Sequence, residues 1–296
     1  MRQPPRTGLV VAALVGVTAI WGSTFVVVKD AIEHMPVLDF LAWRFSIAAL
    51  VMVLLRPRCV ARLGADGRRA GLLLGVALGL GYIAQTIGLQ TASASVSGFI
   101  TGMFVVFTPL TSAVLLRKPP ARSAWVAVAL ATVGLGLLAL HGLTIGRGEA
   151  ITLLCAAAFA LHIVGLGEWS ASRDAYGLAV VQLAVVGIGC GLFAAPGGIV
   201  VPDEASVWWA LALTALAATA VAFVVQTWAQ AHVAPTRAAV IMTMEPVFAG
   251  LFGVSVAGER LGVRELAGAA LILAAMLAVE IGPRQGAEGE VERLEV

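Results

Sequence analysis

Long apolar runs alternate with short polar breaks along almost the whole chain. A helix of about 20 apolar residues crosses a bilayer core about 30 Å thick. In lipid, the backbone N–H and C=O groups of such a run must bond to one another, which a helix achieves within a single segment. The pattern therefore predicts an all-α integral membrane protein with ten transmembrane helices, over residues 8–28, 38–55, 71–90, 96–116, 123–141, 148–167, 176–196, 206–229, 235–256 and 264–282.

The polar breaks contain residues that end helices. Examples are Arg56-Pro57-Arg58, the run from Arg117 to Pro120, and Pro196-Gly197-Gly198. After the last apolar run, residues 283–296 are polar and acidic, a composition that buries too little apolar surface to fold. We expect this last segment to be a cytoplasmic tail.

Composition narrows the class of protein further. The 296 residues are 60% hydrophobic and 12% charged, with a mean hydropathy of +0.96, whereas soluble domains are about 45–50% apolar and about 25% charged. This leaves no room for a sizeable soluble domain, and a net charge of +2 gives no reason to expect a nucleic-acid partner. Cys59, Cys155 and Cys190 lie far apart without paired spacing, so we expect no disulfide, no metal site and no cofactor.

Basic residues set the expected orientation, because cytoplasmic loops of membrane proteins carry an excess of Lys and Arg. With the N-terminus inside, 14 of the 19 Lys and Arg residues fall in cytoplasmic segments, 4 fall in outer loops, and Arg44 lies within a helix. The four outer residues are Lys29, Arg147, Arg260 and Arg264. We therefore expect both termini to be cytoplasmic, with the protein in the lipid bilayer of a bacterial inner membrane.

The two halves of the chain resemble each other when the second is aligned on the first so that Gln226-Thr227 falls on Gln85-Thr86. Without any gap from the third helix of each half to the fifth, this alignment, which we call the repeat register, also superposes Met244 on Met103 and Val247-Phe248 on Val106-Phe107. It predicts two five-helix repeats, over residues 8–142 and 148–282; the alternative is a chance similarity between apolar stretches. Because five spans is an odd number, the second repeat is inverted in the membrane. Inverted repeats characterise transporters, with the site at the repeat interface near the midplane.

Four groups of short motifs lie along the chain. They are Trp21-Gly22-Ser23-Thr24-Phe25 followed by Lys29, Ala42-Trp43-Arg44-Phe45, Phe99-Ile100-Thr101-Gly102-Met103 with Thr108-Pro109-Leu110, and Met244-Glu245-Pro246-Val247 with Gly258-Glu259-Arg260-Leu261. Together they resemble the motifs of EamA-type transporters in the drug/metabolite transporter superfamily. The resemblance implies ten helices, a central cavity, and export of amino acids, metabolites or drugs. One departure is that Arg117-Lys118-Pro119 stands where the second repeat has Gly258-Glu259-Arg260.

Glu245 is the most informative residue for function, because it lies near the centre of the predicted ninth helix. A carboxylate at that depth costs about 2.5–3.5 kcal/mol on insertion scales, so such residues mark ion paths, proton relays or internal pairs. Pro246 follows and cannot donate to the carbonyl of Met242, which predicts a kink. We expect Glu245 to bind a proton or a substrate amine; the alternative is a protonated side chain that bonds to a neighbouring helix.

Other polar and aromatic side chains inside the predicted helices are candidates for the walls of a cavity. Gln85 and Gln226 correspond in the two repeats, and Tyr82 shares a helix face with Gln85. His162 lies in the middle of the predicted sixth helix, as a proton relay or as a neutral structural residue. Aromatic walls for an amphipathic substrate are expected from Trp21, Phe104 and Trp228. The alternatives are polar bonds that hold helices together and ordinary aromatic packing.

Four further residues are expected to have gating or structural roles. Arg44 lies about six residues into its predicted helix, where its side chain reaches the outer surface or pairs with Asp39 or Glu33. Lys29 is expected to anchor the end of the first helix at the outer interface. The prolines that interrupt hydrogen bonding in the fourth and ninth helices are Pro109 and Pro246.

Taken with the resemblance, the sequence predicts a multi-spanning exporter of small molecules that works by alternating access, with proton coupling as a further hypothesis. We expect it to act as a monomer or homodimer on a small-molecule substrate. Two other classes stay open: a non-transporting membrane scaffold or lipid-handling protein, and an intramembrane enzyme. A scaffold has no use for costly polar groups at the midplane. The sequence has no HExxH motif, no paired intramembrane Asp and no activated Ser–His pattern, so we expect no enzyme.

Overall fold

The structure is a computed structural model that describes residues 7–117, 122–141, 144–170, 173–230 and 241–281. In the first half of the chain the elements are α1 (Thr7–His34), α2 (Val37–Leu55), α3 (Cys59–Arg62), α4 (Gly64–Leu89), α5 (Ala94–Gly102), α6 (Phe104–Leu116), α7 (Arg122–Ala139) and the strand β1 (Leu140–His141). In the second half they are β2 (Thr144–Ile145), α8 (Arg147–Ser170), α9 (Ala175–Ala194), the 3-10 turn η1 (Ala195–Gly197), α10 (Ala205–Ala212), the π-helix η2 (Leu213–Val221), α11 (Ala222–Gln230), α13 (Met244–Ser255) and α14 (Val263–Ile281).

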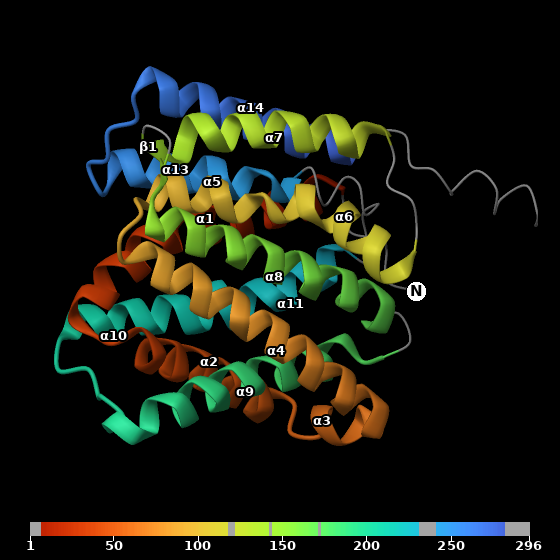
Figure 1. Ribbon diagram of the computed structural model, residues 1–296. Helices are drawn as coiled ribbons and strands as arrows, with labels where there is room; N and C mark the ends of the chain where they lie inside the picture. The colour runs from red at the N-terminus through yellow and green to blue at the C-terminus, as the bar shows by residue number, and fades with distance from the viewer. Residues whose placement is uncertain (1–6, 118–121, 142–143, 171–172, 231–240, 282–296) are drawn as a thin grey trace, which may run out of the picture.

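Most of these helices are long and apolar enough to cross a membrane. Within the described ranges, seven helical stretches meet the length and hydropathy of a membrane span, and two shorter apolar helices cover 124–139 and Met244–Ser255. The long helices run alongside one another, so that their ends gather at two opposite sides of the molecule (Figure 1). The protein is therefore a multi-pass, almost entirely helical membrane protein, and the count of ten spans stays a prediction.

Several helix boundaries differ from the predicted ones. The first helix continues to His34, so Lys29 lies within α1 and not at its end. The third helix begins at Gly64, well before the predicted residue 71. Its first residues are polar, and they continue the helix beyond the end of the apolar stretch. The fifth ends at Ala139, and two residues after it form an antiparallel ladder with β2, which is too short to leave an alternating pattern in the sequence.

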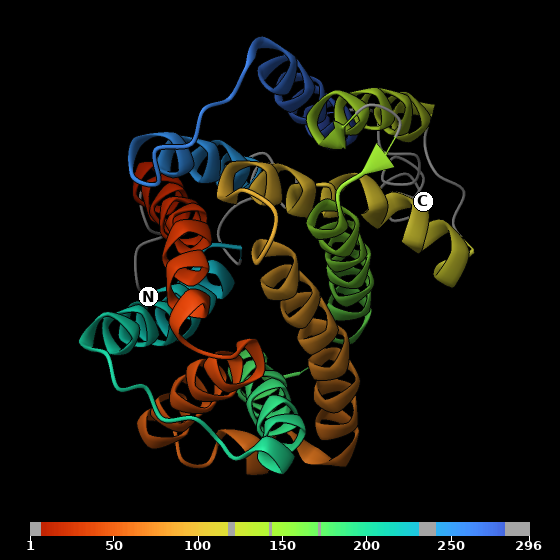
Figure 2. The ribbon, with the colours of Figure 1, turned by 60° about the vertical axis from the view of Figure 1, so that its left-hand side comes forward.

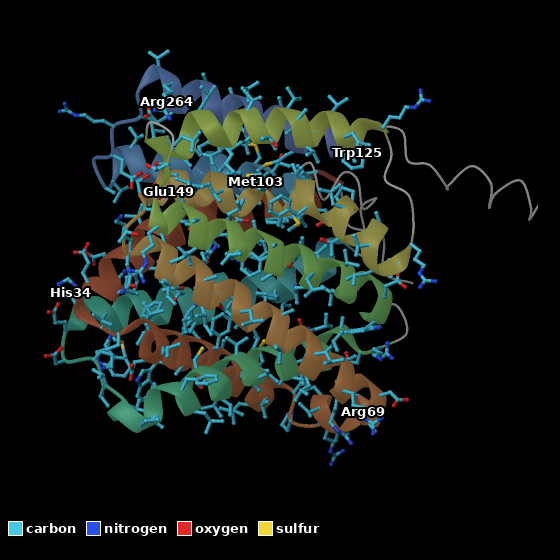
Figure 3. All side chains as sticks on the ribbon, viewed as in Figure 1. His34, Arg69, Met103, Trp125, Glu149 and Arg264 are labelled. Carbon is cyan, nitrogen blue, oxygen red and sulfur yellow. The ribbon has the colours of Figure 1, made fainter. Side chains whose placement is uncertain are left out.

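Two of the predicted helices are interrupted in their middle. The predicted fourth helix divides at Met103 into α5 and α6, and Thr243 separates α13 from the residues before it. The second interruption follows Met242, whose carbonyl Pro246 cannot bond, so the predicted kink takes the form of a break. Residues 235–240 of the predicted ninth helix lie outside the described part. Figure 3 shows Met103 in the interior, between His34 and Arg69 at opposite ends of the bundle.

The helices pack in pairs that join the two halves of the chain. The closest pairs are α7 with α14, α4 with α8, α2 with α9, α4 with α9, α1 with α13, and α5 with α13. Both views place α7 beside α14 at one edge of the molecule (Figures 1 and 2). One apolar core lies mainly among α1, α2, α4 and α9, and a second lies among α5, α6, α7, α8 and α14. The halves are therefore interleaved and share their cores.

Small residues on α4 allow its close contact with α9. A Cβ added at Gly71 would lie 2.7 Å from Val181 Cγ1, and one added at Gly75 would lie 2.7 Å from Val185 Cβ. No real side chain tolerates these distances, so both positions require glycine. Glycine at every fourth position is the pattern that lets membrane helices approach closely.

The beginning of α5 is held by two charged side chains from distant elements. The Glu259 carboxylate, in the loop after α13, accepts hydrogen bonds from the backbone N–H groups of Ala94 at 2.6 Å and Ser95 at 2.9 Å. Lys29 Nζ donates to the carbonyl of Ala92, just before α5. We call the contact of Glu259 with the first N–H groups of α5 the Glu259 clamp. It joins the first half of the chain to the second.

Glu259 reaches α5 because the chain turns sharply after α13. Gly258 adopts a φ of +67°, a left-handed conformation that costs other residues about 1–2 kcal/mol. The N–H of Glu259 then donates to the carbonyl of Gly253 at 3.0 Å. In the Gly-Glu-Arg motif, Gly258 therefore makes the turn and Glu259 caps the helix that faces it.

We predict that Glu259→Ala destabilises the folded protein, because it leaves two N–H groups of α5 without their charged acceptor. A hydrogen bond to a charged group contributes about 1.5–3 kcal/mol, so the apparent Tm in detergent should fall by about 5 °C or more. The matched control is Glu33→Ala, which removes an exposed carboxylate from α1. Equal Tm values for the two variants would show that the clamp does not stabilise the fold.

Candidate functional site

A cavity of about 210 Å³ lies at the centre of the bundle. Its walls come from α1, α2, α4, α5, α6, α8, α9, α11 and α13, and thus from both halves of the chain. The lining residues are Trp21, Thr24, Phe25, Arg44, Leu78, Tyr82, Gln85, Thr101, Phe104, Phe159, His162, Ile163, Leu166, Ala175, Leu178, Ala179, Gln182, Phe223, Gln226, Met242 and Glu245. The surface is mainly apolar and aromatic, with a few polar and charged groups, as is usual for small-molecule sites.

Most of the binding residues expected from the sequence meet at this cavity. Those that line it are Trp21, Tyr82, Gln85, Phe104, His162, Gln226 and Glu245. The side chain of Trp228 lies outside the described part of the structure. Of the four residues expected to gate or support the site, Arg44 lines the cavity, whereas Lys29, Pro109 and Pro246 are not among the lining residues.

Arg44 faces inward, contrary to the expectation that it reaches the surface or pairs with an acid. It is only 3% exposed, and its Nε donates to Thr219 Oγ1 at 3.2 Å. The guanidinium carbon lies 5.0 Å from the centre of the Tyr82 ring, within the range of a cation–π contact. Asp39 bonds elsewhere, since its Oδ1 accepts from the N–H of Val200 at 2.7 Å. The Thr219 hydroxyl and the Tyr82 ring contact the Arg44 side chain in place of the expected ion pair.

The π-helix η2 supplies the acceptors for two cavity residues. Trp21 Nε1 donates to the carbonyl of Ala218 at 2.7 Å, next to the Thr219 hydroxyl that receives Arg44. Thr219 in turn donates to the carbonyl of Thr214 at 2.8 Å, five residues earlier. Interruptions of this kind are common at functional sites, because the wider turn offers groups that a regular helix keeps for itself. The π-helix η2 therefore holds both the Trp21 side chain and the Arg44 guanidinium in place at the cavity.

His162 is held by a second amide in the interior. Its Nε2 lies 2.6 Å from Gln182 Oε1, while Gln182 Nε2 donates to the carbonyl of Leu178 at 3.1 Å. Because the amide nitrogen is already used, the oxygen faces the ring and His162 Nε2 is the donor. In the neutral imidazole the other nitrogen, Nδ1, is then a hydrogen-bond acceptor. The hydrogen bond to Gln182 fits the expectation of a structural, hydrogen-bonded His162. The ring also lines the cavity.

Glu245 lies in the first turn of α13, directly after the break at Thr243, and not in the middle of a continuous helix. The N-terminus of a helix attracts negative charge through its unpaired N–H groups. Among the described residues, no side chain forms a hydrogen bond or an ion pair with the Glu245 carboxylate. The alternative of a Glu bonded to a neighbouring helix therefore has no support from the described contacts, and Glu245 lines the cavity.

The two expected amides make matching contacts. Gln85 Nε2 donates a hydrogen bond to Thr101 Oγ1 at 3.3 Å. Likewise, Gln226 Nε2 donates to Met242 Sδ at 3.6 Å. The repeat register converts the first pair into the second. Both amides therefore tie their own helix to the next one, and both also line the cavity.

Several lining residues were not expected from the sequence. Gln182 carries the same signal as the two expected amides, a polar residue inside an apolar helix, and the sequence could therefore have indicated it. Phe223 and Met242 follow from the repeat, because they correspond to Tyr82 and Thr101 in the repeat register. Phe159 could not be identified in this way, because an aromatic residue in an apolar helix is usually part of ordinary packing. Its ring lies edge-on to Tyr82 at 5.2 Å between centres.

Comparison with known proteins shows the family of this chain. The sequence profile described as the EamA-like transporter family matches residues 8–140 and again residues 146–280. The chain belongs to the EamA-like transporter family. An "Uncharacterized transporter" of Archaeoglobus fulgidus is 34% identical over 266 residues, which are 90% of this chain and 83% of the relative. The "Uncharacterized transporter YoaV" of Bacillus subtilis is 24% identical over 288 residues, covering 89% of this chain and 94% of the relative.

Family membership assigns the coarse function. The EamA-like protein is a multi-pass membrane transporter, so its partners are a small-molecule substrate and the lipid bilayer, and transport is favoured over catalysis. A solved crystal structure matches with a TM-score of 0.60 at 20% identity, covering 91% of this chain and 97% of the other. At this identity the likeness shows the fold alone. No cluster of potential metal ligands occurs within the described ranges.

We predict that cysteines at Gln85 and Gln226 react with a small polar thiol reagent, because both side chains line a cavity that water can enter. The three native cysteines are buried and would first be replaced by alanine. Leu74→Cys, at a buried position outside the cavity wall, is the unreactive control, and Asp203→Cys, in an exposed loop, is the reactive control. The readout is the mass increase of the intact protein. If Asp203→Cys is modified while both cavity variants stay unmodified, the cavity assignment is wrong.

Proposed function

We propose that the protein exports a small molecule by alternating access, through the cavity between two inverted repeats at residues 8–142 and 148–282. The observation that carries this proposal is that the cavity walls repeat with the sequence. Six pairs of lining residues correspond in the repeat register: Trp21 and His162, Phe25 and Leu166, Tyr82 and Phe223, Gln85 and Gln226, Thr101 and Met242, and Phe104 and Glu245. Chance similarity between apolar stretches gives no reason for such pairs to meet at one cavity.

The packing of the helices supports the same symmetry. Exchanging the repeats turns α1 into α8 and α13 into α6, and the contact of α1 with α13 has its counterpart in the contact of α8 with α6. The same exchange turns α2 into α9 and α7 into α14, so the contacting pairs α2–α9 and α7–α14 are each unchanged by it. In an inverted repeat, rocking one repeat against the other closes the site to one side and opens it to the other.

The Glu259 clamp has a place in this cycle. It joins α5 of the first repeat to the loop after α13 of the second, so opening the bundle at this end requires that the clamp break. With both termini in the cytoplasm, as the distribution of Lys and Arg predicts, this end is the outer one. Lys118 corresponds to Glu259 in the repeat register and carries the opposite charge. We therefore propose that the clamp is a lock for one of the two gates only.

Glu245 is the proposed coupling residue. A single carboxylate that holds either a proton or a positively charged substrate couples the two in opposite directions, because binding of one displaces the other. Inward proton flow then drives outward movement of substrate. A scaffold or lipid-handling protein would have no use for a carboxylate and a guanidinium that line an interior cavity and that no described residue neutralises.

The proposal is tested by counterflow in proteoliposomes. A panel of radiolabelled amino acids, organic cations and organic anions is offered outside vesicles that contain the same unlabelled compound in excess. Transient accumulation of at least one compound, absent from protein-free vesicles, is expected. Counterflow by none of the panel would contradict a transport function for small charged metabolites.

We predict that Glu245→Gln abolishes accumulation driven by a pH gradient and leaves passive counterflow measurable, because the amide keeps the shape but cannot exchange a proton. Wild type and variant are compared in the same vesicles with an imposed gradient. Glu33→Gln, which removes an exposed carboxylate of α1 outside the cavity, is the control and should keep its response to the gradient. An unchanged pH response in Glu245→Gln would leave Glu245 without a coupling role.

A further inference from the structure

Arginines gather at the end of the bundle where α2 leads through the four-residue helix α3 into α4. Figure 3 shows Arg69 at this end, whereas Glu149, in the first turn of α8, lies at the other. Residues 56–69 and 167–176 together contain six arginines and three carboxylates, so this end carries a net charge of +3. The arginines are Arg56, Arg58, Arg62, Arg68, Arg69 and Arg173.

Helix α3 turns its arginines outward because its other face is packed against the protein. Cys59 and Leu63 are buried, whereas Arg58 and Arg62 are exposed. Residues four apart share a helix face, so each of these two pairs lies on one face. The buried face lies directly on α9, where a Cβ added at Gly177 would be 2.6 Å from the Cys59 carbonyl oxygen. The packing of α3 therefore fixes the direction of its arginine face.

Two further arginines flank this face with side chains that are already restrained. The Arg56 guanidinium carbon lies 4.8 Å from the centre of the Tyr176 ring, and the Tyr176 hydroxyl donates to a carbonyl of α2 at 2.8 Å. Arg173 donates from Nη1 to the carbonyl of Trp169. Its Cδ lies against the first turn of α4, 3.5 Å from the place of a Cβ at Gly67. Restrained side chains lose less conformational entropy when they bind a ligand.

Exposed leucines adjoin the arginines on the membrane-spanning helices. Leu54 and Leu55 end α2 just before the arginines, and Leu72 and Leu73 follow them on α4. All four side chains are more than half exposed. Lipid acyl chains are as apolar as leucine, so such side chains contact lipid in a membrane span. A ligand at this end therefore meets positive charge next to an apolar, lipid-facing surface.

We propose that this end of the bundle binds an anionic phospholipid, with its phosphate group on Arg58 and Arg62 and with Arg56 and Arg173 at the sides. A guanidinium presents two N–H groups in a planar fork that suits phosphate oxygens. Basic pockets between membrane helices bind lipid headgroups on the cytoplasmic side, where the distribution of Lys and Arg places this end. The proposal does not depend on the transport function.

The chemistry of the surface favours this ligand over its simpler alternatives. Free phosphate would use the arginines and leave the neighbouring leucines without a role. A phospholipid with a choline headgroup has no net charge and would not offset the charge of +3 at this end. An anionic phospholipid uses both features. Because the site joins α2, α3 and the segment before α9, bound lipid should stabilise the folded chain.

The first experiment compares lipids on the unaltered chain. The purified protein in detergent is mixed with phosphatidylglycerol, with phosphatidylcholine of the same acyl chains, or with inorganic phosphate. Phosphatidylglycerol should raise the apparent Tm by about 3 °C or more relative to phosphatidylcholine, because a ligand that binds only the folded state stabilises it. Equal Tm values with the two lipids would overturn the proposal. An equal rise with inorganic phosphate would also overturn it, by showing that the anion alone is bound.

The second experiment assigns the effect to α3. The double variant Arg58→Gln/Arg62→Gln is compared with Arg147→Gln/Arg260→Gln, which removes the same charge from exposed positions at the other end of the bundle. The α3 variant should lose the Tm rise with phosphatidylglycerol, and the control variant should keep it. An equal loss in both would mean that the effect follows net charge alone, and the proposal fails.

Native mass spectrometry provides a readout that does not depend on Tm. Wild type should retain at least one more phosphatidylglycerol molecule per chain than Arg58→Gln/Arg62→Gln, and equal retention contradicts the proposal. Arg58→Lys/Arg62→Lys keeps both charges on the same face and should retain the lipid, which separates loss of charge from loss of fold. Loss of the lipid from this variant as well would exclude binding through the charges of α3.

Discussion

The hydrocarbon core of a bilayer offers no hydrogen-bond partner, so every polar group placed there must find one in the protein or in an internal cavity. The described interior follows this constraint closely: Trp21 and Arg44 bond to η2, His162 bonds to Gln182, and Glu259 caps α5. Among the described residues, Ser97 Oγ is the one fully buried side-chain nitrogen or oxygen atom without a hydrogen-bond partner. Where pairing between protein groups stops, at the cavity, the remaining donors and acceptors are those that a substrate can use.

A shared two-fold plan and its local exceptions explain different properties of the molecule. The plan accounts for the interleaved helices and for the matching contacts of Gln85 and Gln226. The exceptions include charged residues, since Glu245 corresponds to Phe104 and Glu259 corresponds to Lys118. Duplication thus accounts for the frame that the two halves share, and divergence between the copies accounts for Glu245 in the cavity and for the Glu259 clamp at one end.

Much of this fold could be predicted from the sequence, because a helix that crosses a membrane needs a long apolar run. The residues that end helices and the repeat without gaps added to this pattern. The same signal located Glu245, Gln85 and Gln226, since polar residues inside apolar runs are conspicuous. It could not give the environment of Arg44, because whether a long side chain turns to the surface or inward depends on the tertiary neighbours of its helix. Nor could it show the π-helix, whose composition resembles that of any apolar helix.

That π-helix restricts the chain in a way that no single side chain does. In a helix, adding or removing one residue turns everything beyond it by about 100°. On one side of η2, Trp208 of α10 packs edge-on against Trp43 with ring centres 5.7 Å apart, and on the other side Phe223 and Gln226 of α11 face the cavity. Removing one residue from Leu213–Val221 would restore a regular helix and keep only one of these two faces in position. The length of this segment is therefore constrained more tightly than its composition, and a deletion there would be more harmful than most substitutions.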